Sequence, residues 1–247
     1  MAVRLPFVEW GTPGIEHEAV WLPRLAPQLP VRIPAALGVG SPDEIYPCPW
    51  LVVDWLPGDC PVPGEVRDPD LLPGDLAMFL SLLRQADTTA APPGHRGGSL
   101  HVLDDPVRDC LRHVEDLVDV GNLTRSWEHS LSAAPWAGEP VWVHCDLLTG
   151  NVLVADGRLV GVLDSAASGI GDPACDLMAA WGILLASARG TFCDGAGIDD
   201  ATWARGRGWA PSQAVIDLPY YRETNRVLAA NSLHALTELA RETLNAG

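Results

Sequence analysis

Three polar side chains between positions 146 and 164 have the types and the spacing that phosphoryl transfer requires. The chain reads His144-Cys145-Asp146 and then reaches Asn151, which makes the pattern H-x-D-x-x-x-x-N, and Asp164 follows thirteen residues after Asn151. Transfer to a hydroxyl needs one carboxylate that accepts or orients the hydroxyl proton. It also needs a second carboxylate and an amide oxygen that hold the Mg²⁺ bridging the nucleotide phosphates. The pattern is therefore typical of a kinase catalytic loop followed by its metal-binding aspartate.

Short apolar strands are expected to bring these groups together. One strand is predicted at Val141–Val143, a second at Asn151–Val154 and a third at Leu159–Leu163. The pair Asp156-Gly157 between the second and the third is a two-residue hairpin signal. Because each of the polar groups lies at an end of one of these strands, we expect the three side chains to converge on one point.

The wording of these motifs resembles that of the aminoglycoside phosphotransferase family. The segments HCDLLTGNVL, LDS and GDPACDL are similar to the family's H-G-D-hydrophobic-x-x-x-N, hydrophobic-D-[FW] and G-D-P-x-x-D-L. The resemblance extends from Ala2 to near the C-terminus. It implies an α+β, protein-kinase-like two-lobed fold. A shortened N-terminal nucleotide-binding lobe would span residues 1–57, and a mainly helical C-terminal lobe with the catalytic loop and substrate site would span residues 58–247.

The resemblance also implies a role for each residue that matches the motif. Asp146 would be the catalytic base, and His144 would brace the catalytic loop. Asn151 and Asp164 would be the ligands of Mg²⁺, which accompanies ATP or GTP as the phosphate donor. Asp176 would tie the catalytic loop to the first helix after it.

At the N-terminus, the resemblance implies that the chain starts at the family's third strand, without two earlier strands and the loop that covers the nucleotide phosphates. That third strand presents a lysine to the phosphates in the family, and Arg4 occupies the position here. Its acidic partner would be Glu18, or Glu16 in another register. Arginine keeps the positive charge and can bind phosphate with two donors, although its geometry differs from that of lysine. The alternative is that Arg4 is a surface cation on an edge strand.

Two residues inside the motifs depart from the family's pattern. Cys145 replaces the usual glycine, which suggests a backbone position with little room for a side chain. Ser165 replaces the aromatic residue that usually follows the metal-binding aspartate. The packing behind Asp164 is therefore expected to be weaker than in the family.

The composition limits the classes of partner. The net charge is −16, with 32 acidic residues against 16 arginines and no lysine, which disfavours nucleic-acid binding. An acidic surface would attract a cationic ligand, or it would only keep the protein in solution. The six cysteines form no C-x-x-C pair, so a reduced, cytoplasmic protein is expected. No apolar run approaches the about 20 residues that span a bilayer, and the oligomeric state is left open.

Hydrophobic periodicity and turn residues predict the remaining elements. Further strands are expected at 2–6, 35–40 and 50–55, and helices at 14–29, 71–86, 106–120, 122–133, 174–188 and 219–244. The resemblance implies a nucleotide-binding hinge at 53–58, and a loop at 57–70 is expected to join the lobes.

Four further polar residues carry separate expectations. The connector at 88–99 is rich in Pro and Gly, so its His95 and Arg96 are expected in solvent, although a role toward substrate or phosphate is the alternative. Asp172 is expected to cap the helix that begins after it. Arg205 is expected in a salt bridge, although contact with an anionic group is an alternative.

Three functional hypotheses follow. The first is an ATP- or GTP-dependent phosphotransferase that acts on a hydroxyl of a small molecule, such as an aminoglycoside, another antibiotic or a sugar-like alcohol. The second is a catalytically impaired or repurposed kinase-fold protein that binds a small ligand or performs other biosynthetic chemistry. The third is a thiol enzyme that uses Cys145 beside His144. Adjacent residues of an extended segment point to opposite sides, which disfavours the third.

Overall fold

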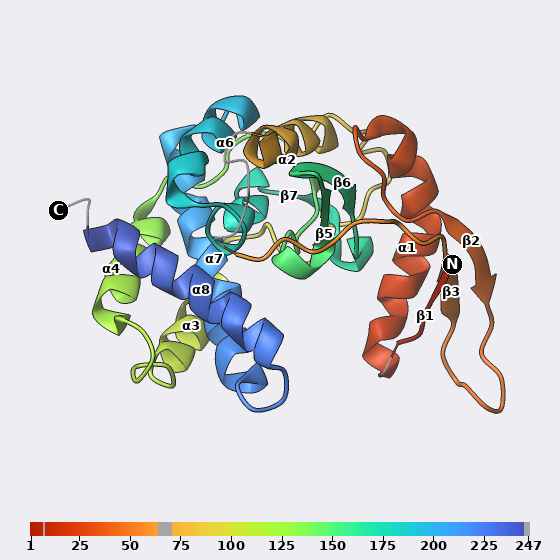
Figure 1. Ribbon diagram of the computed structural model, residues 1–247, viewed down its shortest axis with the longest axis horizontal. Coiled ribbons are helices and arrows are strands. Elements are labelled where there is room, and N and C mark those ends of the chain that lie inside the picture. Colours follow the sequence, from red (N-terminus) through yellow and green to blue (C-terminus); the bar gives the residue numbers. More distant parts are fainter. Residues whose placement is uncertain (7, 64–70, 245–247) are drawn as a thin grey trace.

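A small sheet with one helix packed against it lies at one end of the molecule, and most of the helices lie at the other end (Figure 1). The computed structural model describes residues 1–6, 8–63 and 71–244. Residues 64–70 of the predicted 57–70 loop therefore lie outside the described residues. No helix in the described part of the chain is both long and apolar enough to cross a membrane.

The N-terminal sheet has three antiparallel strands in the order β1-β3-β2. They are β1 (Ala2–Arg4), β2 (Ala36–Gly40) and β3 (Trp50–Val53). Arg4 lies opposite the fully buried Leu51, so the register places both residues on the inner face of the sheet. The three predicted strands are confirmed, each with slightly shorter bounds.

Helix α1 (Thr12–Leu25) packs its apolar face against this sheet and the catalytic region. The buried positions on that face include Ile15, Leu22 and Leu25, at the spacing of successive helical turns. Pro23 lies inside the helix, and a 3-10 turn, η2 (Ala26–Gln28), continues it. The predicted helix at 14–29 is confirmed, and its prolines shorten it at the C-terminal end rather than breaking it.

The catalytic hairpin is formed by β5 (Val152–Ala155) and β6 (Arg158–Val162), which pair antiparallel. Asp156 and Gly157 between them have φ angles of 50° and 78°. Both angles are in the left-handed region that a type I′ turn requires, so the predicted hairpin is confirmed. Strand β4 (Val141–Val143) does not join this hairpin and instead pairs with β7 (Gly169–Gly171), a strand that the sequence pattern did not predict.

Helices make up most of the rest of the described chain. They are α2 (Leu71–Leu83), α3 (Asp104–Leu111), α4 (Val120–Ser132), α5 (Ala179–Gly182), α6 (Arg189–Ala196), α7 (Asp200–Tyr221) and α8 (Arg226–Leu244). Short 3-10 helices lie at η1 (Glu9–Gly11), η3 (Leu100–Leu103), η4 (Thr149–Asn151), η5 (Ser165–Ala167), η6 (Pro173–Met178) and η7 (Ala186–Ala188).

Three predicted helices differ from those observed. The helix predicted at 106–120 already ends at Leu111. The helix predicted at 174–188 is divided among η6, α5 and η7. The boundary predicted at Pro219 is wrong, because α7 continues through that proline to Tyr221. Helix α7 packs against α3, α4, α8 and η6, so tertiary packing offsets the poor helix propensity of its prolines and glycines.

The core is continuous from α1 to α8 and contains large aromatic side chains. Trp127, Trp142 and Trp181 are fully buried, and the ring of Trp181 lies 4.5 Å from that of Trp203, between centroids. Trp209 on α7 is also buried.

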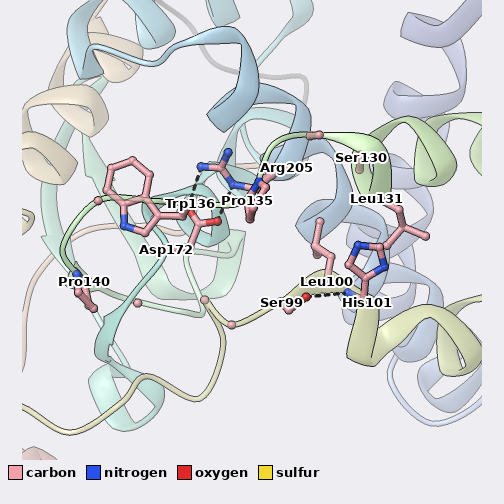
Figure 2. A pocket seen from close by; sticks show the side chains of 15 residues that line it. Ser99, Leu100, His101, Ser130, Leu131, Pro135, Trp136, Pro140, Asp172 and Arg205 are labelled. Carbon is pink, nitrogen blue, oxygen red and sulfur yellow. Dashed lines mark hydrogen bonds and ion pairs between the residues drawn. The ribbon is translucent and has the colours of Figure 1, made fainter.

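A buried ion pair joins the start of η6 to α7 (Figure 2). Asp172 accepts a hydrogen bond from the backbone N–H of Ala174, as predicted for a helix cap. Both of its carboxylate oxygens also accept from Arg205, Oδ2 from Nε at 2.6 Å and Oδ1 from Nη2 at 3.2 Å, so the expected salt bridge of Arg205 is present. The pair borders a cavity of about 450 Å³. Because Arg205 also donates to the Ala134 carbonyl and to Thr202 Oγ1, its guanidinium is fully engaged in structural contacts.

The close approach of α7 to η6 gives a prediction about Gly206. A Cβ at this position would lie 2.7 Å from Cβ of Leu177, so Gly206→Ala forces the two elements apart. We expect the free energy of unfolding to fall by about 1–3 kcal/mol, the usual effect of overpacking a core. Gly74 in α2 is the matched control, because an added Cβ there meets nothing within 4 Å. Denaturant unfolding should show Gly74→Ala to be neutral or more stable by about 0.5–1 kcal/mol; equal stability of both variants would contradict the packing.

Candidate functional site

The predicted site residues Asp146, Asn151 and Asp164 line one cavity of about 620 Å³. Its walls come from the catalytic loop, from the end of β6, from the connector that carries His95 and Arg96, and from α7 and α8. The contributing residues are Trp10, His95, Arg96, Asp146, Leu148, Thr149, Gly150, Asn151, Asp164, Ala167, Met178, Gly182, Ala210, Gln213, Ala214, Asp217, Tyr221, Leu228, Asn231, Ser232 and Ala235.

The catalytic loop is closed by hydrogen bonds between its own residues. Nδ2 of Asn151 donates to the Asp146 carbonyl at 2.8 Å and to Oδ2 of the same residue at 2.9 Å. The amide nitrogen is therefore committed to the loop, and the amide oxygen Oδ1 is the atom that Asn151 can offer to a cation.

His144 is hydrogen-bonded at both of its ring nitrogens. Its Nδ1 accepts from the backbone N–H of Asp146 at 3.3 Å. The proton of the ring is therefore on Nε2, which donates to the Leu163 carbonyl at 2.9 Å. These two contacts connect the catalytic loop to the end of the strand that precedes Asp164.

Asp176 holds the same loop from the buried side. Its two carboxylate oxygens accept from the backbone N–H groups of His144 and Cys145, each at 2.8 Å. Burial raises the pKa of Asp176, and the imidazole of His144 and these hydrogen bonds oppose the rise. The carboxylate therefore replaces its lost hydration with backbone donors, in agreement with the predicted role.

Cys145 occupies a backbone conformation that glycine usually supplies. Its φ is 67°, and its side chain is fully buried. The thiol donates to the Arg96 carbonyl at 3.3 Å, and it fills a space beside Gly94, where an added Cβ would lie only 2.7 Å from the sulfur. Because both ring nitrogens of His144 are engaged elsewhere, the geometry gives no support to a thiol enzyme.

Arg4 connects the N-terminal sheet to the candidate metal-binding aspartate. Its Nη1 donates to Oε1 of Glu18 at 2.8 Å, and its Nη2 donates to Oδ1 of Asp164 at 2.7 Å. Of the two partners considered from sequence, Glu18 is fully buried and pairs with Arg4, whereas Glu16 is exposed. Arg4 therefore points into the site and is not a free surface cation.

The donor set of the site suits Mg²⁺. Asp164 is 42% exposed at its side chain, and one of its carboxylate oxygens is not used by Arg4. The Asp164 oxygen that Arg4 does not use and Oδ1 of Asn151 are two hard oxygen donors that belong to residues lining one cavity. Within the described residues no three His, Cys, Asp or Glu side chains are grouped as a metal cluster. Two protein donors completed by phosphate oxygens are the usual arrangement for Mg²⁺ at nucleotide sites, so the residues fit this ion.

Ser165, at the position where the family pattern has an aromatic residue, is part of a hydrogen-bonded turn with Ser168. Its carbonyl accepts from the hydroxyl of Ser168 at 2.7 Å, and His17 bonds to the same hydroxyl at 3.0 Å. This hydrogen-bonded turn, rather than an aromatic ring, lies behind Asp164.

The structure corrects the expectation that Arg96 is in solvent. Its Nη1 donates to the Cys145 carbonyl at 2.6 Å and to Oδ1 of Asp146 at 2.9 Å, and its Nη2 donates to Oε1 of Gln213. His95, the other residue of that expectation, is exposed. Arg96 lies fifty residues before Asp146 and in no motif, so only the folded chain brings it to the site.

Asp217 on α7 is a second residue that the sequence pattern missed. It accepts from Nε2 of Gln213 at 2.8 Å and lines the cavity. Burial raises its pKa, and the nearby Asp146 contributes in the same direction. No spacing in the sequence distinguishes Asp217 from the other acids of the helical part.

Comparisons with known proteins agree with this geometry. A family model described as "Phosphotransferase enzyme family" matches residues 1–209. The GDP and kanamycin complex of APH(2")-IIia superposes with a TM-score of 0.72 at 18% sequence identity, covering 99% of this chain and 86% of the other. The apoenzyme of macrolide 2'-phosphotransferase MphH from Brachybacterium faecium gives 0.56 at 22% identity, with coverage of 95% and 83%. These likenesses confirm the predicted fold class. A comparison with curated sequences gives no match.

The burial of Glu18 predicts a dependence of stability on pH. Burial raises the pKa of Glu18 to about 7, against the opposing effect of Arg4, from an ordinary value of 4.5. The folded protein therefore holds this proton more tightly than the unfolded chain does. The free energy of unfolding should fall as the pH rises from about 4.5 to about 7, by at most about 3 kcal/mol from this group.

The variant Glu18→Gln removes that contribution, because an amide does not titrate. Its free energy of unfolding should change less between pH 5 and pH 7.5 than that of the native protein, as measured by denaturant titration at each pH. Glu16→Gln is the control, since Glu16 is exposed on the same helix. A pH dependence of Glu18→Gln identical to that of the native protein would refute the effect.

Proposed function

The chain belongs to the phosphotransferase enzyme family, and we propose that it transfers the γ-phosphate of ATP or GTP to a hydroxyl of a small molecule. The observation that supports this most directly is the placement of Asp146, Asn151 and Asp164 on one cavity. A protein that only binds a ligand does not need a carboxylate, an amide and a second carboxylate in this arrangement.

Asp146 is proposed as the catalytic base. Its side chain is 26% exposed and faces the cavity, so a hydroxyl of the acceptor can donate to a carboxylate oxygen there. The carboxylate orients this hydroxyl toward the phosphate and takes its proton as the bond to phosphorus forms. Asn151 and His144 keep the carboxylate in place through the hydrogen bonds of the loop.

The donor side of the site is assigned to Arg4, Asn151 and Asp164. Asn151 and Asp164 would hold Mg²⁺, which when bound neutralises charge on the transferred phosphate. Arg4 is anchored by Glu18 through one nitrogen, so its other nitrogen can turn from Asp164 to a phosphate oxygen. The segment 53–58 is proposed as the hinge whose backbone groups bind the adenine or guanine ring of the nucleotide. Two related structures are described as GDP and ADP complexes, so ATP and GTP both remain candidate donors.

The acceptor is proposed to lie between the catalytic loop and helices α7 and α8. With Asp146 and Asp164 assigned to chemistry, Asp217 is the carboxylate of this cavity that can pair with a cationic group. Apolar side chains make up much of the surrounding wall, among them Leu148, Met178, Ala214, Leu228 and Ala235. A hydroxylated molecule with a cationic group and an apolar face fits this wall. All six cysteines are free, which suits the cytoplasm as the proposed location.

The role of Asp146 predicts the behaviour of Asp146→Asn. An amide of the same shape cannot accept the hydroxyl proton, so kcat should fall by about 10²–10⁴-fold while nucleotide binding is retained. The measurement is phosphate transfer from Mg·ATP and Mg·GTP to kanamycin, gentamicin, streptomycin and a macrolide. Asp156→Asn is the control, because Asp156 is exposed in the hairpin turn and away from the cavity. Full turnover by Asp146→Asn would exclude this base.

Removal of the metal gives a second prediction. Mg·ADP should raise the melting temperature of the protein, and chelation of Mg²⁺ with EDTA should remove most of that shift. Asp164→Asn should lose the Mg²⁺-dependent part of the shift, whereas the Asp156→Asn control should keep it. An unchanged melting temperature with millimolar Mg·ADP and Mg·GDP would instead favour the catalytically impaired alternative.

A further inference from the structure

Arg96 reaches from the connector between α2 and η3 across the cavity to the catalytic loop. Two of its guanidinium contacts are with that loop, at the Cys145 carbonyl and the Asp146 carboxylate, and a third is with Gln213 on α7. Its side chain is only 18% exposed. The guanidinium therefore lies between the proposed base and the wall proposed for the acceptor.

The backbone on both sides of Arg96 is fixed to β7 and its flanks. The N–H groups of Gly94 and His95 donate to the carbonyls of Ile170 and Ala167, at 3.0 and 2.9 Å. The Gly97 carbonyl accepts from the N–H of Asp172 at 2.8 Å. Gly97 has a φ of +93°, and an added Cβ there would lie 3.2 Å from the backbone nitrogen of Asp172. The connector is therefore packed closely against the end of β7. Arg96 therefore projects from a fixed backbone and not from a free loop.

The carboxylate of Asp146 is held from two sides. Arg96 donates to Oδ1 at 2.9 Å, and Asn151 donates to Oδ2 at 2.9 Å. One donor alone would leave the carboxylate free to rotate about its side-chain torsions. Two donors on different oxygens, each from a separate segment, define its plane.

We propose that Arg96 is a positioning residue that fixes the orientation of the Asp146 carboxylate toward the acceptor hydroxyl. This inference rests on the proposed phosphotransferase function. Arg96 acts through Asp146 and through the Cys145 carbonyl, which sets the backbone of the same loop.

The number of contacts argues against a gate that swings away in each cycle. Displacement of Arg96 would break three hydrogen bonds of a charged group in a partly buried place. A motion that breaks all three is too unfavourable to be the ordinary open state. Arg96 accordingly stays in contact with the loop during turnover.

The contact with Gln213 extends the arrangement to the acceptor wall. Gln213 accepts from Arg96 with its oxygen and donates with its nitrogen to Asp217. The sequence of contacts Asp146, Arg96, Gln213 and Asp217 therefore joins the base to the carboxylate proposed for a cationic acceptor. These contacts link the orientation of the Asp146 carboxylate to α7, the helix proposed to bind the acceptor.

Steady-state kinetics test the proposal with Arg96→Ala, Arg96→Lys and the control Arg112→Ala. Arg112 is exposed and pairs with Asp109 on α3, outside the cavity. The reaction is transfer from Mg·GTP or Mg·ATP to kanamycin, with hydrolysis by water measured in parallel. Arg96→Ala should lower kcat about 10²-fold with the nucleotide KM within about twofold, since a misplacement near 1 Å has this effect. Arg96→Lys should be intermediate, and added guanidinium ion should restore Arg96→Ala in part.

The control Arg112→Ala should match the native protein and gain nothing from guanidinium. An Arg96→Ala enzyme with native or higher kcat would overturn the proposal, and so would a loss carried wholly by the nucleotide KM. If Arg96→Ala does not fold, Arg96→Gln takes its place with the same expectations.

A structural measurement separates this inference from the proposed function. Crystal structures of the native protein and of Arg96→Ala should show the Asp146 carboxylate rotated or in two orientations in the variant. A carboxylate that stays within about 0.5 Å of its native position would overturn the proposal, because productive geometry is defined on that scale. If native protein shows no turnover with kanamycin or water and yet Asp146 moves in the variant, the proposed function fails while the positioning contact stands.

Discussion

The site depends on one buried carboxylate, that of Asp176, which accepts from two consecutive backbone N–H groups of the catalytic loop. A buried anion is strongly unfavourable unless donors replace its hydration, and two backbone donors at 2.8 Å provide that replacement. The loop can therefore adopt the left-handed conformation at Cys145 that turns Asp146 into the cavity. Without this anchor, the positive φ of a residue other than glycine would have little to stabilise it.

Two arginines from different parts of the chain then hold two of the three carboxylates that line the cavity. Arg4 comes from the first strand and holds Asp164, and Arg96 comes from the connector and holds Asp146. Each arginine has a second anchor, Glu18 or Gln213, on a helix. Asp146 and Asp164 are thus each paired with a fixed cation, whereas Asp217 accepts a hydrogen bond from the neutral amide of Gln213.

Sequence patterns could predict the features whose residues lie close together in the chain. The conformation of the Asp156-Gly157 turn is set by its own two residues, so the turn signal was enough. Motif and spacing also indicated the loop from His144 to Asn151, although the structure holds that loop through remote contacts as well. Arg96 could not be found, because its partners Asp146 and Gln213 are remote in the chain. Asp217 is bonded to Gln213 only one helical turn away, and it could not be found because its place in the cavity depends on the packing of α7. The continuity of α7 through Pro219 was missed for a related reason, since tertiary packing on several sides outweighs the propensity of one residue. The early end of α3 and the division of residues 174–188 among three short helices were missed for the same reason, since local propensity does not include tertiary packing.

The thiol of Cys145 occupies the volume that a side chain at position 94 would need. An added Cβ at position 94 would also lie 2.9 Å from the Arg96 carbonyl oxygen, so the catalytic loop and the connector are closely packed at this point. An engineer who restores glycine at 145 would open a void against the connector, and one who adds a methyl group at 94 would push on the loop. The effects of the two changes should therefore be non-additive, because the two positions are in contact.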